Sequence, residues 1–255
     1  GCASRFPHYM HSYGFHGLHG RALPVACGVK ARRPDLKIWV ATGDGDCCSI
    51  GAGHWLHGIR FNMDMTVMLF DNNIYGLTKK QTSPTTPSGT VTNTSPDGAW
   101  LPPLNVLENV LGFTNVSFVA RTVDWNAAHL HDTLRRAYDH NGLSFVHILQ
   151  RCPTYTAHIF DDWRNDPEKV LLLEHETGVE IADSVGKIFT NRKGHDPSDL
   201  AEARRLAVMT DQLALGLFYC NPDAPRYENF TYRGLEKNEV ERRQAIESEL
   251  DRFTI

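Results

Sequence analysis

Four short runs of β-forming residues alternate with stretches of helical character, and this alternation is the feature that most constrains the fold. The runs cover residues 37–42, 66–70, 117–123 and 144–150. The helical stretches cover residues 17–32, 48–61, 103–111 and 126–141. Continuous apolar runs of this length are typical of strands buried on both faces. The pattern therefore predicts an α/β fold, an open and mostly parallel sheet with helices on both faces.

Two short polar segments directly follow the first two predicted strands. Residues 43–46 read Gly-Asp-Gly-Asp, and residues 71–73 read Asp-Asn-Asn. Ligands of such sheets bind at the carboxyl ends of the strands, and a single crossover brings both segments to that edge. Carboxylate and amide oxygens suit Mg²⁺, which also takes oxygens from bound phosphates. The alternative is two unrelated loop turns, but their position after successive strands favours one site for a metal and a diphosphate.

Three further features support a phosphate site at this edge. Gly43 and Gly45 allow the backbone to approach phosphates closely. A helix starting near Ser49 would add N–H groups and the positive end of its dipole. The loop over 78–103 is rich in Thr, Ser, Pro and Gly, and a loop this long inside a compact domain is usually functional.

The pattern loosens after the last of these strands. We interpret residues 1–155 as one α/β domain and residues 156–255 as a C-terminal extension, irregular in pattern, that packs on the domain or on a partner subunit. Within this extension, residues 199–216 have the pattern of a helix.

Composition excludes some classes of protein. The formal net charge of −4 gives no electrostatic case for nucleic acid as the main partner. No apolar run approaches the ~18 residues that a membrane span requires. The six cysteines are irregularly spaced in a chain too large to need disulfides. We therefore expect a reducing, cytoplasmic location.

Longer strings in the sequence carry a family resemblance. Gly43-Asp44-Gly45 followed by Asn72 resembles the thiamine diphosphate signature. Four segments are similar to the β subunit of 2-oxoacid:ferredoxin oxidoreductases, most like the 2-oxoglutarate type. They are GCASRFPHYMHSYGFHGLHGRA from residue 1, DNNIYGLTKKQTSPT from residue 71, CPTY from residue 152 and LGLFYCNPDAPRY from residue 215. The resemblance is dense over about residues 1–155 and looser beyond.

The resemblance implies a set of site residues. Asp44, the side chain of Asn72 and the main-chain carbonyl of Ile74 would bind Mg²⁺, with Asp71 and Asn73 in supporting roles. Lys79 would be the catalytic lysine beside the 2-oxoacid, where a dicarboxylate requires a cation. Lys80 reads as a solvated loop residue, at a position where many members carry Gly. The residues expected around the cofactors are Gly1, Cys2, Ala3, His19, Gly43, Asp44, Gly45, Asp46, Asn72, Tyr75, Gly76, Leu77 and Thr78.

The resemblance also implies a [4Fe-4S] cluster held by four thiolates. Cys2 and Cys152 match two of them, and the Cys-x-x-Cys that supplies the other two in the family is absent from this sequence. We expect the chain to be part of a longer protein that contains this pair. The alternative is a relative that has lost the cluster, because two thiolates alone make a poor cluster site.

The activity implied is oxidative decarboxylation of a 2-oxoacid, most like 2-oxoglutarate, to an acyl-CoA. Electrons would pass through the cluster to ferredoxin, and the reverse reaction would fix CO₂. An α subunit would supply the catalytic glutamate and the pyrimidine pocket in a heterodimer or a dimer of heterodimers. The alternatives are pyruvate or a branched-chain 2-oxoacid as substrate, a cluster-free thiamine diphosphate decarboxylase subunit, and a non-catalytic subunit. Retention of Asp44, Asn72 and Lys79 argues against the last.

Overall fold

The computed structural model describes residues 2–231 and 238–252 of the 255-residue chain. Within these residues, seven strands form a single sheet. The strands are β1 (Trp39–Gly43), β2 (Met65–Asp71), β3 (Phe118–Val123), β4 (Leu143–Leu149), β5 (Val170–Glu174), β6 (Arg192–Gly194) and β7 (Leu213–Cys220).

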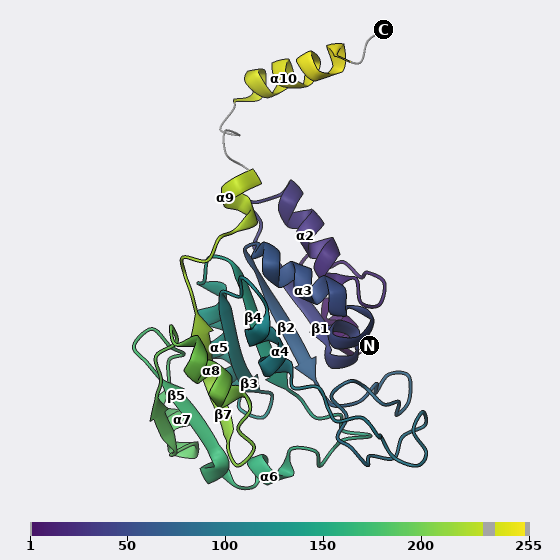
Figure 1. Cartoon of the computed structure of the whole chain (residues 1–255), viewed down its shortest axis with the longest axis vertical. Helices are drawn as coiled ribbons and strands as arrows, with labels where there is room; N and C mark the ends of the chain where they lie inside the picture. Colours follow the sequence, from purple (N-terminus) through teal and green to yellow (C-terminus); the bar gives the residue numbers. More distant parts are fainter. Residues whose placement is uncertain (1, 232–237, 253–255) are drawn as a thin grey trace.

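The order of the strands across the sheet is β1-β2-β4-β3-β7-β5-β6 (Figure 1). The first four strands of the sequence are parallel to one another. Strand β7 pairs antiparallel with β3, and β5 lies parallel to both β7 and β6. Every residue of β2, β3 and β4 is buried, as expected for strands that are covered on both faces. The mostly parallel α/β sheet predicted from the sequence is confirmed.

Helices cover both faces of this sheet. Trp55 of α3 stacks on Phe145 of β4 with ring centroids 5.7 Å apart. The next residue of β4, Val146, points to the opposite face, where it shares a hydrophobic cluster with Ala137 of α5. The helices are α1 (Phe6–Tyr9), α2 (Ala22–Arg32), α3 (Ala52–Phe61), α4 (Val106–Gly112), α5 (Ala127–Tyr138), α6 (Asp161–Arg164), α7 (Asp183–Ile188), α8 (Leu200–Ala207), α9 (Tyr227–Thr231) and α10 (Glu239–Asp251).

The helix after β1 begins earlier than the sequence indicates. Helical backbone starts at Asp44, directly after the strand, and continues through a π-helical turn over Asp46–Ile50 before α3. The sequence predicted a helical start near Ser49, because Gly43–Asp46 has the composition of an open turn. Single π-helical turns of this kind occur often at functional sites.

The sequence pattern of residues 199–216 predicts one helix, and the structure differs there. Helix α8 ends at Ala207, and β7 begins at Leu213. A short apolar run such as Leu213–Phe218 fits a buried strand as well as a buried helix. Here it pairs with β3, and together with β5 and β6 it extends the sheet from within the predicted C-terminal extension.

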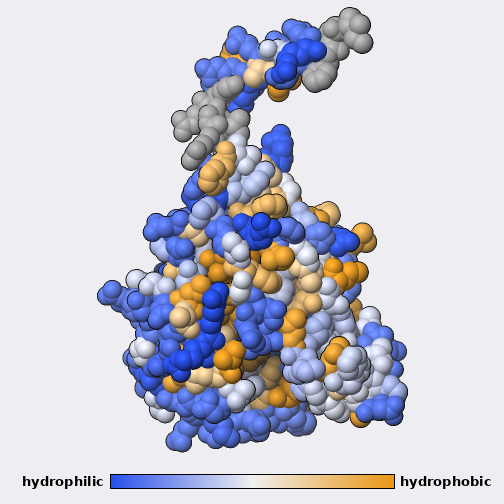
Figure 2. Space-filling model, in the orientation of Figure 1, coloured by the Kyte–Doolittle hydropathy of each residue, from blue (hydrophilic) through white to orange (hydrophobic). Residues whose placement is uncertain are grey.

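The last described helix, α10, begins with a capping box between Asn238 and Glu241. Its side chains are mainly hydrophilic on the face seen in Figure 2. Among the helices of the described residues, none combines the length and apolar composition needed to cross a bilayer.

Lys30 of α2 is a buried cation that fixes the start of the sheet. Only 2% of the residue is exposed. Its ammonium group donates to the carbonyls of Pro34 and Leu36 at 3.0 and 2.8 Å, and to Asp64 Oδ2 at 3.1 Å. These bonds join the connection between α2 and β1 to the residue that precedes β2. Asp64 also accepts a bond from the more exposed Lys37 at 3.3 Å.

We predict that Lys30→Met lowers the free energy of unfolding by about 2–4 kcal/mol, because two carbonyls and the Asp64 carboxylate lose their buried, charged donor. Lys37→Met removes the exposed partner of the same carboxylate and is expected to cost less than about 0.5 kcal/mol. Urea unfolding of the chain followed by circular dichroism measures both. Equal effects of the two substitutions would contradict the assignment.

Candidate thiamine diphosphate and metal site

The carboxyl ends of β1 and β2 lie side by side in a parallel register. Asp44 follows β1 and Asp71 ends β2, and each is only 3% exposed. The Ser83 hydroxyl donates to Asp44 Oδ2 at 2.6 Å. Thr85 Oγ1 lies 2.8 Å from Asp44 Oδ2 and 2.8 Å from Asp71 Oδ1. Ser83 and Thr85, here called the hydroxyl bridge, thus connect the two polar segments that the sequence predicted to meet.

A hydroxyl carries one proton, so Thr85 cannot donate to both carboxylates at once. One of the two acids must therefore carry a proton, or a cation must lie beside them. Burial, and then the neighbouring Asp71 carboxylate, raise the pKa of Asp44 well above its usual range. Both hydroxyls of the bridge contact Oδ2, so Oδ1 is the Asp44 oxygen that they leave to a cation. This is the electrostatic setting in which a divalent metal ion replaces a proton.

Two buried basic side chains, His147 and Arg121, interact with Asp71. His147 Nε2 lies 2.9 Å from Asp71 Oδ2, and burial lowers the pKa of His147 against the effect of this contact. Arg121 is also buried, with its guanidinium carbon 5.2 Å from the centre of the Phe218 ring. Burial lowers the pKa of Arg121 to about 10, which leaves the side chain charged at neutral pH. Arg121 therefore offsets part of the negative charge of Asp71.

The segment after β2 folds into two successive Asx turns. The Asp71 side chain accepts from the Asn73 N–H at 3.2 Å, and the Asn72 side-chain oxygen accepts from the Ile74 N–H at 3.3 Å. Asn73 has a left-handed φ of 56°. The Thr86 hydroxyl holds this residue by donating to its carbonyl at 2.7 Å. Asn72 and Ile74, the second and third expected metal ligands, are thereby placed on the same turn.

Tyr75 covers the turn that follows Asp44. Its hydroxyl donates to the Gly45 carbonyl at 2.8 Å. A Cβ at Gly45 would clash with the Tyr75 ring, so any side chain at this position would displace Tyr75. The requirement for glycine here is therefore one of space, since Gly45 has an ordinary helical φ of −68°.

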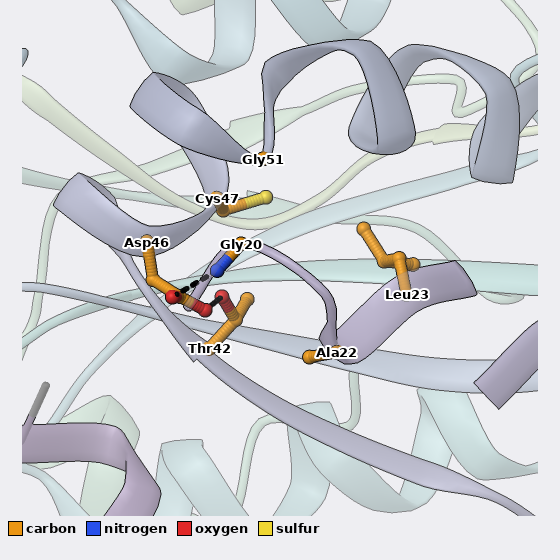
Figure 3. A pocket seen from close by; sticks show the side chains of 7 residues that line it. All are labelled: Gly20, Ala22, Leu23, Thr42, Asp46, Cys47 and Gly51. Carbon is orange, nitrogen blue, oxygen red and sulfur yellow. Dashed lines mark hydrogen bonds between the residues drawn. The ribbon is translucent and has the colours of Figure 1, made fainter. Parts of the chain in front are cut away.

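Asp46 is occupied by contacts within the protein. One carboxylate oxygen accepts from the Gly20 N–H at 2.7 Å and contacts His19 Nδ1, and the other accepts from the Thr42 hydroxyl at 2.8 Å (Figure 3). The His19 ring also lies edge-on to Tyr75. The small cavity beside Asp46, which Cys47 also lines, holds about 10 Å³. That is room for a water molecule and nothing larger. Asp46 thus fastens the 19–20 turn to β1.

Cys2 and Cys152 both lie beside Gly76. A Cβ at Gly76 would be 3.3 Å from the Cys152 sulfur and 3.5 Å from the Cys2 sulfur. The Thr156 hydroxyl donates to the Asn72 carbonyl at 2.9 Å and accepts from the Cys152 N–H at 3.0 Å. The two cysteines expected from the sequence to share a cluster are therefore brought together, next to the turn that carries Asn72.

The remaining predicted residues lie around this edge. Ala3 packs against the hydrophobic cluster that includes Phe70 of β2. Leu77, Thr78 and Lys79 are exposed at the start of the long loop. Gly1, which was also expected at the cofactor, lies outside the described residues.

Several residues of the site were not predicted from the sequence. They are Ser83, Thr85, Thr86, Arg121, His147 and Thr156. The first three belong to the Thr- and Ser-rich loop whose composition did indicate a functional segment. Arg121 and His147 are charged or titratable residues inside runs predicted as buried strands, and that mismatch is the signal that would have marked them.

The metal ligands expected at this site are all oxygen atoms. In the part of the chain that the structure describes, no group of three or more His, Cys, Asp or Glu side chains is placed to hold a metal ion. The three ligands expected from the sequence are instead the Asp44 carboxylate, the Asn72 side-chain oxygen and the Ile74 main-chain carbonyl, which lie directly after β1 and β2. Such oxygens suit Mg²⁺, which takes its other ligands from phosphate and water.

Comparisons with known proteins give the family of the chain. Residues 1–148 match the family model of the thiamine pyrophosphate enzymes, C-terminal TPP binding domain. The 2-oxoglutarate oxidoreductase subunit KorB of Mycobacterium tuberculosis is 45% identical over 177 residues, 69% of this chain and 47% of that protein. The 2-oxoacid:ferredoxin oxidoreductase 2 subunit beta of Aeropyrum pernix is 35% identical over 233 residues, 89% of this chain and 71% of that protein.

Among solved structures, the 2-oxoglutarate:ferredoxin oxidoreductase from Magnetococcus marinus superposes with a TM-score of 0.79 at 33% sequence identity. The match covers 97% of this chain and 79% of that one. That structure has 2-oxoglutarate, coenzyme A and succinyl-CoA bound. The chain spans about half the length of some of these relatives, 47% for the M. tuberculosis subunit. These similarities, with the geometry at the ends of β1 and β2, show that the chain belongs to the thiamine diphosphate-binding β subunits of 2-oxoacid:ferredoxin oxidoreductases.

Proposed function

We propose that this chain is the β subunit of a 2-oxoglutarate:ferredoxin oxidoreductase. The complex would decarboxylate the 2-oxoacid oxidatively to an acyl-CoA, with electrons leaving one at a time to ferredoxin, and would run in reverse to fix CO₂. Thiamine diphosphate, when bound, supplies the carbon nucleophile for this chemistry, and a [4Fe-4S] cluster accepts the single electrons. Two relatives support 2-oxoglutarate as substrate: the 2-oxoglutarate oxidoreductase subunit of M. tuberculosis and the M. marinus enzyme with 2-oxoglutarate bound.

The observation that carries the proposal is the hydroxyl bridge between Asp44 and Asp71. It holds two buried carboxylates so close that one of them requires a proton or a cation. Asp44 directs its second oxygen away from the bridge, and Asn72 and Ile74 follow Asp71 on one turn. A magnesium ion ligated by Asp44, Asn72 and the Ile74 carbonyl would satisfy this arrangement.

We assign the diphosphate to the backbone around Gly45 and Gly76. A side chain at Gly45 would clash with Tyr75, and Gly76 lies beside the two cysteine sulfurs. The helical turn that starts at Asp44 would add N–H groups. Asp46, which the resemblance placed at the diphosphate, would act by holding His19 and Gly20 beside it.

The electron-transfer half of the proposal concerns Cys2 and Cys152. Both sulfurs lie beside Gly76, which supports a role in holding two corners of a cluster close to the diphosphate. The other two thiolates would come from a Cys-x-x-Cys outside this sequence. Iron and sulfide analysis of the complex formed with the full-length subunit tests this point, with about four irons expected per cluster site.

The acid that activates thiamine would come from the partner α subunit, together with the pyrimidine pocket. Within this chain, Lys79 would meet the 2-oxoacid, since it is exposed three residues after Gly76. The test is to purify the complex of the full-length chain with its α subunit. We expect reduction of ferredoxin that depends on both 2-oxoglutarate and coenzyme A. A complex that decarboxylates 2-oxoacids without reducing ferredoxin would instead support a cluster-free decarboxylase.

We predict that Asp44→Asn weakens binding of Mg²⁺ and thiamine diphosphate to the complex by more than about 100-fold, because it removes the only anionic ligand. The unliganded protein is expected to keep or gain thermal stability, since the substitution removes a buried charge beside Asp71. Calorimetric titration and thermal unfolding measure the two quantities. An exposed acid, Asp35→Asn, serves as the control and should leave cofactor binding unchanged. Unchanged cofactor binding in Asp44→Asn would refute the metal assignment.

Thr85→Val removes the shared hydroxyl and keeps the shape of the side chain. We expect about 10- to 100-fold weaker Mg²⁺ binding, the usual effect of losing a group that orients a metal ligand. Thr94→Val in the same loop removes an exposed hydroxyl, which accepts from the Thr82 N–H, and should change Mg²⁺ affinity less than twofold. Titration of both variant complexes with Mg²⁺ at saturating thiamine diphosphate gives the comparison. Equal effects would show that the bridge has no role at the metal.

The chain alone is expected to be inactive, because the proposed proton donor lies on the α subunit. Purified full-length chain should show no 2-oxoglutarate oxidation with ferredoxin, and activity should appear when α subunit is added. Full oxidation by the isolated chain would contradict the proposed division of the site between subunits.

A further inference from the structure

Lys79 and Lys80 form an unusual backbone turn. Both residues have left-handed φ values, 71° and 57°. This conformation costs an ordinary residue about 1–2 kcal/mol and is usually taken by glycine or asparagine. Two successive lysines in it mark a local strain that the surrounding structure must maintain. Strain of this kind is concentrated at functional sites.

Asn93 maintains the strained turn. Its main-chain N–H donates to the Lys80 carbonyl at 2.8 Å, and its side-chain amide donates to the Lys79 carbonyl at 2.7 Å. Tyr75 and Gln81 close the base of the turn by two main-chain bonds of 2.9 and 3.3 Å. One residue from the far arm of the loop thus binds both strained peptides, while the near arm is tied to the residue that covers Gly45.

The strain is not explained by an ion pair. Among the described residues, no acidic group lies within ion-pairing distance of either lysine. Lys79 is exposed and Lys80 is half-buried. The turn starts at Gly76, which lies beside the sulfurs of Cys2 and Cys152. The fold therefore places two successive lysines three and four residues after Gly76, in a turn whose conformational cost glycine at residue 80 would avoid.

We infer that Lys80 is a specificity-determining residue, which with Lys79 binds a 2-oxoacid that carries a second carboxylate, and that Asn93 positions both lysines. This inference rests on the proposed function. A dicarboxylate presents two anionic groups and gains from two cations, whereas a monocarboxylate uses only one. The sequence suggested a solvated residue at position 80. The left-handed φ of 57° that points to a role for Lys80 cannot be read from the sequence and is seen only in the fold.

The test compares two substrates in the complex of the full-length chain with its α subunit. Lys80→Asn and Lys80→Gly remove the charge, and both residues tolerate a left-handed φ. We expect kcat/KM for 2-oxoglutarate to fall about tenfold in each, mainly through KM, and kcat/KM for pyruvate to change less than twofold. Lys80→Arg keeps the charge and should retain most of the preference. Lys80→Gly also relieves the strain, so its thermal stability should equal or exceed that of the parent.

Asn93→Ala provides an independent arm, because it leaves both lysines in place and removes the amide that binds Lys79. The same loss of preference for 2-oxoglutarate is expected, with pyruvate little affected. Asn191→Ala removes an exposed amide that donates to the Glu168 carbonyl, and it should leave kcat/KM unchanged for both substrates. Lys187→Asn in α7 is the control for loss of an exposed lysine.

The outcomes separate the inference from the proposed function. If the parent complex oxidises 2-oxoglutarate and Lys80→Asn lowers kcat/KM equally for both substrates, or for neither, the inference is wrong and the proposed function stands. If the parent complex oxidises no 2-oxoacid with ferredoxin as acceptor, the proposed function fails and the inference fails with it.

Discussion

The closeness of two buried carboxylates is the constraint on which the site depends. Asp44 and Asp71 share the single proton of Thr85, in surroundings where like charges repel strongly. The fold tolerates this because His147 contacts Asp71 and the charge of Arg121 interacts with it favourably. Nothing comparable lies beside Asp44 in the described residues, where burial and Asp71 raise its pKa. The charge distribution thus favours a cation at Asp44 rather than at Asp71.

The three acidic residues of the two polar segments, Asp44, Asp46 and Asp71, therefore have different roles. Asp44 is the candidate metal ligand, Asp71 orders the turn that carries Asn72, and Asp46 binds three groups of the protein. Their environments, and not their chemical type, distinguish them. The proposed cluster site and the proposed metal site are joined by one side chain. The Thr156 hydroxyl accepts from the Cys152 N–H and donates to the Asn72 carbonyl. A shift of Cys152 would therefore be transmitted to Asn72 through Thr156.

Much of this arrangement follows from local patterns in the sequence. The four parallel strands and their helices were predictable because the apolar runs are short and separated by clear helical stretches. The meeting of Asp44 with the Asp71–Asn73 segment follows from the parallel topology alone. The hydroxyl bridge was not predictable, because Thr85 reaches Asp44 across 41 residues of sequence. Strand β7 was mistaken for part of a helix, since its apolar run has no distinguishing period.

The length of the loop after β2 has a physical explanation in the strained residues that it contains. Three of the non-glycine residues with positive φ, Asn73, Lys79 and Lys80, lie in its first arm. Each is held by a residue of the returning arm: Thr86 binds the Asn73 carbonyl, and Asn93 binds both lysine carbonyls. A short connection would have no second arm to supply these donors, and the first arm would relax to ordinary φ values. The loop must therefore fold back on itself, and its many Thr and Ser residues provide the hydroxyls that join the arms.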